Sequence, residues 1–189
     1  MSRVIRTVAV TAALAGAVLV PSAAASAATP GPDTAAATVQ FAGGSANGLT
    51  MAPEAPKGTK AVLEANPSAA AAAANVCGSG YTISVSAARY GSYGTVYTWT
   101  NGKTSGPNAY YDKPICGVFF NDTGAARYMG IRLNDNYTAT PAVEDFGTYS
   151  TYAGPVYQNR GYCGTVYSYM KQPNGTVVVD NKLGVGACN

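Results

Sequence analysis

The chain of 189 residues contains no histidine. Histidine is the base of serine–histidine and cysteine–histidine nucleophilic sites, and it is a common zinc ligand, so its absence excludes these sites. The cysteines are too far apart in the sequence to suggest a thiolate metal site, and no Gly-rich phosphate loop is present. We therefore expect no catalytic residues of these classes, no metal and no cofactor.

Charge is also scarce. Charged residues make up 11% of the chain, and its formal net charge is +3. From residue 75 onward, eight Lys and Arg stand against six Asp and Glu. A balance so mild and scattered does not indicate a nucleic-acid partner. The six acids are Asp112, Asp122, Asp135, Glu144, Asp145 and Asp180. A pair of them could hydrolyse a wall polysaccharide by two-carboxylate catalysis. Most of them lie beside turn residues, however, as solvated loop carboxylates do.

The first 27 residues have the pattern of a secretory signal peptide. Arg3 and Arg6 precede an apolar stretch over 7–20, and small residues follow Pro21 with a cleavage pattern ending at Ala27. The apolar stretch is shorter than the ~20 residues that a membrane-spanning helix needs, and no twin arginine is present. We expect general secretion, an extracellular location and no transmembrane anchor after processing.

Residues 28–75 are rich in Ala, Pro, Gly and Thr and include six consecutive alanines at 69–74. Such a segment offers little bulky apolar surface to offset the entropy of ordering it. The composition predicts a mostly disordered linker or pro-region, with a short helix around 60–64 and the alanine run, broken at Pro67. A clipped pro-peptide and a spacer to the cell wall fit equally well.

From residue 76 to residue 189 the hydrophobic period is two, which is typical of half-buried strands. Asn101-Gly102 favours a hairpin turn. The pattern predicts an all-β domain of about seven short antiparallel strands, either a sandwich or a small barrel. The expected strands are 81–87, 93–100, 115–121, 128–133, 146–157, 162–170 and 176–179. The fifth of these is expected to be interrupted at residues 153–155.

Four cysteines in a secreted chain indicate two disulfides, for which three connectivities exist. Pairing within neighbouring strands favours Cys77 with Cys116 and Cys163 with Cys188. A four-residue turn after Lys171 would place Cys163 opposite Gly184, so the second pair requires the chain to bend back near its end.

Aromatic residues gather on two similar strands, which share the sequence Gly-Thr-Val-Tyr at 94–97 and 164–167. Alternation places Tyr97 and Trp99 on one face of the first strand, and Tyr167 and Tyr169 on the corresponding face of the second. A solvated face of this kind suits stacking on sugars or docking of a surface protein. The alternative is that these rings form the core or cross-strand pairs that hold the sheet.

Three segments resemble the spore-associated protein A family of small secreted proteins from filamentous sporulating bacteria. They are the sequence Cys-Gly-Ser-Gly-Tyr at 77–81, the segment Tyr-Ser-Thr-Tyr-Ala-Gly-Pro-Val-Tyr at 149–157 and the cysteine-bearing strand at the C-terminus. The resemblance covers residues 76–189 and implies an extracellular, spore-associated protein with no established enzymatic activity and no site residues to transfer. We therefore expect a non-enzymatic surface protein that binds wall polysaccharide or a surface protein.

Two other functions remain open. One is a protease inhibitor that presents a rigid loop, such as residues 103–113, between strands anchored by cysteines. The other is the carboxylate-dependent wall hydrolase, which needs two of the six acids roughly 5–10 Å apart in one cleft.

Overall fold

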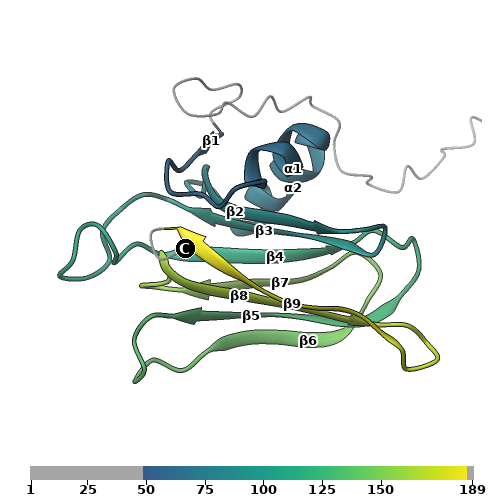
Figure 1. Cartoon of the computed structure of the whole chain (residues 1–189). Helices are drawn as coiled ribbons and strands as arrows, with labels where there is room; N and C mark the ends of the chain where they lie inside the picture. Colours follow the sequence, from purple (N-terminus) through teal and green to yellow (C-terminus); the bar gives the residue numbers. More distant parts are fainter. Residues whose placement is uncertain (1–48, 187–189) are drawn as a thin grey trace, which may run out of the picture. The chain divides into compact units, whose positions relative to one another are not determined.

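The computed structural model describes residues 49–186, which form two β-sheets and two short helices (Figure 1). The predicted signal peptide, the first part of the predicted linker and Cys188 lie outside the described residues. The elements in chain order are β1 Thr50–Met51, α1 Thr59–Ala65, α2 Pro67–Cys77, β2 Ile83–Tyr90, β3 Gly94–Thr100, β4 Ile115–Asn121, β5 Arg127–Asp135, β6 Val143–Tyr149, β7 Tyr152–Gln158, β8 Cys163–Lys171 and β9 Val177–Gly186.

The strands form a five-stranded sheet in the order β1-β2-β3-β4-β7 and a four-stranded sheet in the order β6-β5-β8-β9. All neighbouring strands are antiparallel except the two-residue β1, which pairs in parallel with β2. The predicted all-β antiparallel fold is confirmed. Because the strands divide into two separately paired sheets, the fold is a sandwich-like arrangement.

The main core lies between the two sheets. Met129, Ile131 and Leu133 alternate along β5 and are almost fully buried, as their period of two predicts. They meet side chains of the five-stranded sheet such as Val96 and Phe119. The inner face of each sheet therefore forms this core. Whether the outer face of a sheet can contact a ligand depends on what covers that face.

The two helices cover the outer face of the five-stranded sheet (Figure 1). Asn66 caps α2 by accepting a hydrogen bond from the Ala69 amide at 3.1 Å, and Pro67 occupies the first turn. Asn at the cap and Pro at the first helical position are both favourable, because the first amides of a helix have no partner within it. Pro67 thus separates α1 from α2 and opens the second helix.

Disorder is the wrong prediction for the described residues 49–75, whereas the helix expected around 60–64 and the alanine run, with its break at Pro67, is confirmed. Ala70, Ala73 and Ala74 are buried against the sheet, where they pack in one cluster with Tyr97 and Trp99. Each alanine contributes little apolar surface, but its small side chain lets the helix backbone approach the sheet closely. In this second core, between the helices and the sheet, the bulky side chains come from the sheet. The composition of the alanine run therefore did not indicate that these residues are buried. The folded domain begins before the predicted boundary at residue 76.

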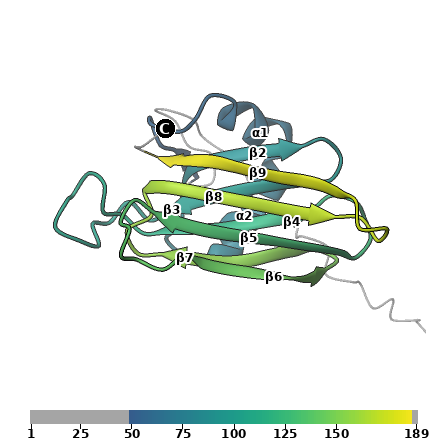
Figure 2. The same cartoon turned by 60° about the horizontal axis from the view of Figure 1, so that its bottom comes forward.

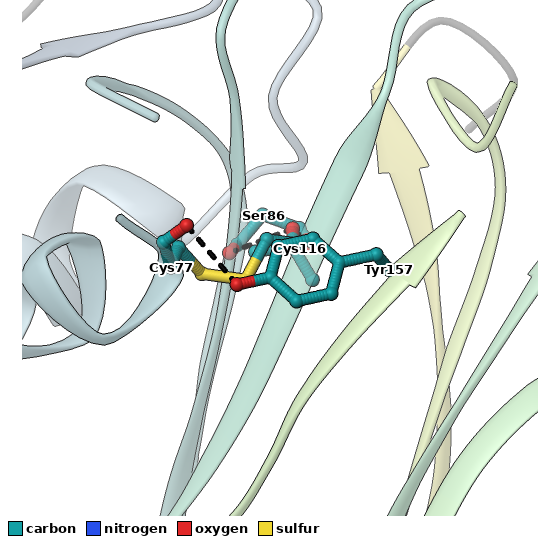
Figure 3. Close-up of a disulfide and its surroundings, with 5 residues drawn as sticks. Cys77, Ser86, Cys116 and Tyr157 are labelled. Carbon is teal, nitrogen blue, oxygen red and sulfur yellow. Dashed lines mark hydrogen bonds between the residues drawn. A yellow bond between two sulfur atoms is a disulfide. The ribbon is translucent and has the colours of Figure 1, made fainter. Parts of the chain in front are cut away.

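A disulfide between Cys77 and Cys116 joins the end of α2 to β4, with 5.8 Å between the two Cα atoms (Figure 3). The Tyr157 hydroxyl donates a hydrogen bond to the Cys77 carbonyl at 3.1 Å. The first predicted pairing is confirmed. The pairing of Cys163 with Cys188 stays a prediction, because Cys188 lies outside the described residues.

Two predicted strand connections are wrong. Asn101-Gly102 is not a two-residue hairpin turn but the beginning of a long loop that connects β3 to β4. Thr100, the last residue of β3, pairs with Ile115, the first residue of β4. The expected bent strand over 146–157 is two strands, β6 and β7, which belong to different sheets. The sequence signal at Gly154-Pro155 lies inside β7, an edge strand, where a missing amide donor is tolerated.

The register of β8 and β9 also differs from the prediction. Met170 pairs with Val179 and Lys171 with Val177, so an irregularity in β9 shifts the register. Cys163 consequently faces Gly186 rather than Gly184. The residue opposite Cys163 is therefore two positions nearer to Cys188 in the sequence than predicted.

Candidate functional site

The structure divides the four predicted ligand-binding residues into two unrelated pairs. Tyr97 is 1% exposed and Trp99 is 0% exposed, because α1 and α2 cover their face of the sheet. Neither ring presents a stacking surface, so the prediction that they bind a ligand together with Tyr167 and Tyr169 is wrong. For this pair, the alternative interpretation as core residues holds.

The alternating burial along β8 places Tyr167 and Tyr169 on the outer face of the four-stranded sheet. Figure 2 shows that this sheet lies on the side of the domain away from both helices. Both side chains are partly exposed. The neighbouring strand β5 and the next strand β6 bring two further rings to the same face: Tyr128, which is 41% exposed, and Phe146. We call the four residues Tyr128, Phe146, Tyr167 and Tyr169 the aromatic platform.

The rings of the platform are neighbours. Phe146 lies 6.4 Å from Tyr167 and 6.4 Å from Tyr169, measured between ring centroids. Tyr167 and Tyr169 are also 6.4 Å apart, with an angle of 28° between their planes, and Tyr128 contacts Tyr169 edge-on at 6.4 Å. Four aromatic rings from three neighbouring strands therefore gather on one face of the sheet.

Gly130 makes room for this arrangement. In the register of the sheet it stands between Phe146 on β6 and Tyr169 on β8. A Cβ atom at this position would lie 2.1 Å from the Phe146 ring. The absent side chain therefore lets Phe146 lie over the β5 backbone and reach the tyrosines of β8.

Charged side chains lie among the rings. The Arg132 guanidinium is 5.5 Å from the Phe146 ring centre and 5.6 Å from that of Tyr167, and it pairs with Glu144. The Lys171 ammonium is 4.5 Å from the Tyr128 ring centre. Cations over ring faces at such distances are held by the ring quadrupole. The platform is thus amphipathic, with apolar faces edged by donors and acceptors.

The Tyr167 hydroxyl donates to Asp180 on β9 at 2.9 Å. Desolvation and then this hydrogen bond raise the pKa of Tyr167. The phenol stays neutral over the physiological range, so its ring carries no charge that would oppose stacking. A shallow hollow of about 300 Å³ adjoins the Tyr128 end of the platform and is lined by Lys171, Gln172 and Pro173 among others.

Sequence reasoning missed Tyr128, Phe146, Arg132 and Gly130 as members of the site. The signal was present for β5, because Tyr128 and Arg132 alternate with the buried Met129, Ile131 and Leu133 and must therefore point outward. Phe146 gave no such signal, because its strand was not separated from β7. The sequence also did not indicate that the two helices cover the outer face of the five-stranded sheet.

The loop at 103–113, expected to be presented by an inhibitor, is held together by the buried Asp112 side chain. Asp112 accepts hydrogen bonds from the Asn108 amide at 2.9 Å and from the Tyr137 hydroxyl at 2.5 Å. Its own backbone carbonyl accepts from the Ser105 amide at 2.8 Å. Tyr110 and Tyr111 remain exposed on this loop at 47% and 39%.

Two of the six acids accept hydrogen bonds from backbone amides. Asp135 accepts the Tyr137 amide at 2.8 Å, and Asp145 accepts the Gly154 amide at 2.7 Å. Glu144 and Asp180 share the outer face of the four-stranded sheet, but three strand spacings separate β6 from β9, which amounts to about 14 Å. That exceeds the roughly 5–10 Å of paired catalytic carboxylates.

Searches over the described part of the chain found no cluster of three or more metal-ligating side chains. They also found no helix there that is long and apolar enough to span a membrane. No protein-family model matches the chain, and neither a curated protein nor a solved structure matches it.

Proposed function

We propose that this is a non-enzymatic, secreted protein that associates with the spore or cell surface by binding a wall polysaccharide on its aromatic platform. The observation that carries the proposal is the set of four neighbouring, partly exposed rings on a sheet face that no described element covers. The signal-peptide pattern and the resemblance to the spore-associated protein A family support the location.

The chemistry of the platform matches that of a sugar chain. A pyranose ring has an apolar face of C–H groups, which stacks on aromatic rings, and an edge of hydroxyl groups, which needs donors and acceptors. Arg132, Glu144 and Asp180 lie beside the rings and provide these groups. Cations and anions are nearly balanced on this face, which favours a neutral or weakly charged polysaccharide over a strongly acidic one.

The expected energy is modest for each ring. If a sugar covers roughly 50 Å² of apolar surface on one ring, the contact contributes about 1.2 kcal/mol. Loss of two rings then weakens binding on the order of 50-fold. Affinity for a long polysaccharide is increased further by repeated sites along the chain.

The test is a depletion assay with purified peptidoglycan and spore walls, comparing the secreted protein with a Tyr167→Ser/Tyr169→Ser variant. The control is Tyr110→Ser/Tyr111→Ser, which removes two tyrosines that are more exposed than the platform pair from another part of the molecule. We expect retention to fall for the platform variant and to stay unchanged for the control. Equal retention of both variants, or no retention of the unmodified protein, would refute the proposal.

Protease inhibition is the second candidate function, favoured by the anchoring of the 103–113 loop through Asp112. A rigid loop loses little entropy on binding, which is what a tight inhibitor needs. Titration of serine and cysteine proteases with the protein would show stoichiometric inhibition. The Tyr110→Ser/Tyr111→Ser variant would lose inhibition under this alternative while keeping retention on walls.

A further inference from the structure

A separate hollow of about 200 Å³ lies on the outer face of the five-stranded sheet, where the corner between α1 and α2 meets β3 and β4. Val62 and Ala69 contribute its helical wall. The rings of Tyr97 and Phe120, which meet edge-on at 5.9 Å, contribute its sheet side. The hollow is smaller than the roughly 300–1,000 Å³ of sites for drug-sized ligands, so it suits a molecule with few heavy atoms.

Two opposite charges stand at this hollow. Arg89 lies on β2 and is 53% exposed, and Asp122 follows β4 and is 28% exposed. The Arg89 Nε atom donates to the Gly91 carbonyl at 3.0 Å and lies 4.0 Å from Oδ2 of Asp122. The same Oδ2 accepts from the Thr95 hydroxyl at 2.7 Å.

These contacts leave binding capacity on both groups. Among residues 49–186, no hydrogen bond reaches the two terminal nitrogens of Arg89 or Oδ1 of Asp122. A guanidinium with two free nitrogens binds a carboxylate well, because its planar fork matches the two oxygens. A carboxylate with a free oxygen accepts from an ammonium group. The hollow therefore offers complementary partners for a molecule that carries both charges.

The Tyr97 hydroxyl is a further polar group here. Burial raises the pKa of Tyr97, the negative charge of Asp122 raises it further, and Arg89 opposes the effect. The hydroxyl is therefore a neutral donor and acceptor at physiological pH. No described residue forms a hydrogen bond with it.

We propose that the hollow binds a small zwitterion of amino-acid size with an aliphatic side chain. Its carboxylate contacts Arg89, its ammonium group contacts Asp122, and its side chain packs between Val62, Ala69 and the Phe120 ring. A simple anion would be repelled by Asp122 and a simple cation by Arg89. An uncharged apolar molecule would desolvate both charges without replacing their hydrogen bonds, which is costly.

The experiment is an NMR titration of the ¹⁵N-labelled secreted protein with valine as the probe. We expect saturable shifts at the backbone amides of Arg89, Thr95 and Asp122, with a Kd on the order of 1 mM, as befits a ligand of so few atoms. Valine methyl ester lacks the carboxylate charge and N-acetylvaline lacks the ammonium charge. Each should bind at least ten-fold more weakly.

Variants test the two charges separately. Arg89→Gln and Asp122→Asn should each weaken valine binding at least ten-fold, whereas the control Lys182→Gln, which removes an exposed cation from β9 of the other sheet, should leave it unchanged. Amide shift dispersion reports whether each variant is folded. Equal binding of the blocked valines, shifts confined to the aromatic platform, or no saturable shift at 50-fold excess over the expected Kd would overturn the proposal. The blocked ligands decide the matter on the unmodified protein even if a variant fails to fold.

Discussion

Arg160 Nε lies 3.0 Å from Oδ1 of Asp112, and Asp112 is completely buried by this contact and its neighbours. The Arg160 guanidinium also lies 3.5 Å above the centre of the Tyr137 ring. Other ion pairs in the described residues have both partners partly exposed. This pair therefore connects the 103–113 loop to the segments that follow β5 and β7.

Replacing Asp112 should loosen this loop in a pH-dependent way. Burial alone raises the pKa of the Asp112 carboxyl, but its contacts with Tyr137, Arg160 and the Asn108 amide lower it to about 2 from the ordinary 3.8. A lowered folded-state pKa contributes stability that is present above about pH 4 and is lost as pH falls toward 2. The unmodified protein should therefore melt at a higher temperature than Asp112→Asn at pH 7.

Thermal unfolding at pH 7, 4 and 2 checks this prediction through the difference between the two proteins, since other carboxylates titrate in both. The difference should shrink toward pH 2. Asp180→Asn serves as the control, because Asp180 is exposed on β9. A difference that is independent of pH would show that the contacts of Asp112 do not depend on its charge.

Loss of the disulfide between Cys77 and Cys116 should destabilise the domain by roughly 4 kcal/mol, because a cross-link between residues 39 positions apart restricts the unfolded chain. The Cys77→Ala/Cys116→Ala variant is followed conveniently, since Trp99 is the single tryptophan and is buried beneath the helices. Its emission should shift to longer wavelength at a lower denaturant concentration. An unchanged midpoint would mean that packing alone holds α2 to the sheet.

Enlarging a buried alanine of α2 should destabilise the protein. Ala73 is 0% exposed against the sheet, so Ala73→Leu forces additional atoms into a packed layer and costs about 1–3 kcal/mol. The partly exposed Ala72 lies on the same helix, and Ala72→Leu should change the free energy of unfolding by only about 0.5 kcal/mol. Denaturant unfolding of the two variants gives the comparison. Equal stability would indicate that the alanine run does not pack as described.

Filling the space above Gly130 should displace Phe146. The Cβ of Gly130→Ala would lie 2.1 Å from the Phe146 ring, which must then move away from Tyr169. NOE contacts between these two rings should weaken, and retention on wall polysaccharide should fall by on the order of ten-fold, as for the loss of one ring. Thr165→Ala, on the same face of β8, is the control. Intact NOE contacts together with unchanged retention would contradict the role given to this glycine.

The sequence alone determined the fold class and part of its detail. The alternation of Met129, Ile131 and Leu133 indicated a strand with one buried face, and the structure has β5 there. Residues 115–121 were predicted as a strand with the bounds that β4 has. The pairing of Cys77 with Cys116 followed from the secretory pattern and the order of the strands. Each of these inferences rests on local periodicity or on covalent chemistry, which a single sequence carries.

The tertiary structure decided which aromatic residues can meet a ligand. Trp99 and Tyr169 lie on similar strands with the same alternation, yet one is buried and the other is partly exposed. The difference arises because an alanine-rich helix covers one sheet, whereas no element among residues 49–186 covers the outer face of the other. Because alanine has little apolar surface, the alanine run did not predict that this helix packs on a sheet. Burial of an outward face depends on distant segments of the chain, so the location of the candidate site emerged only from the assembled sheets and helices.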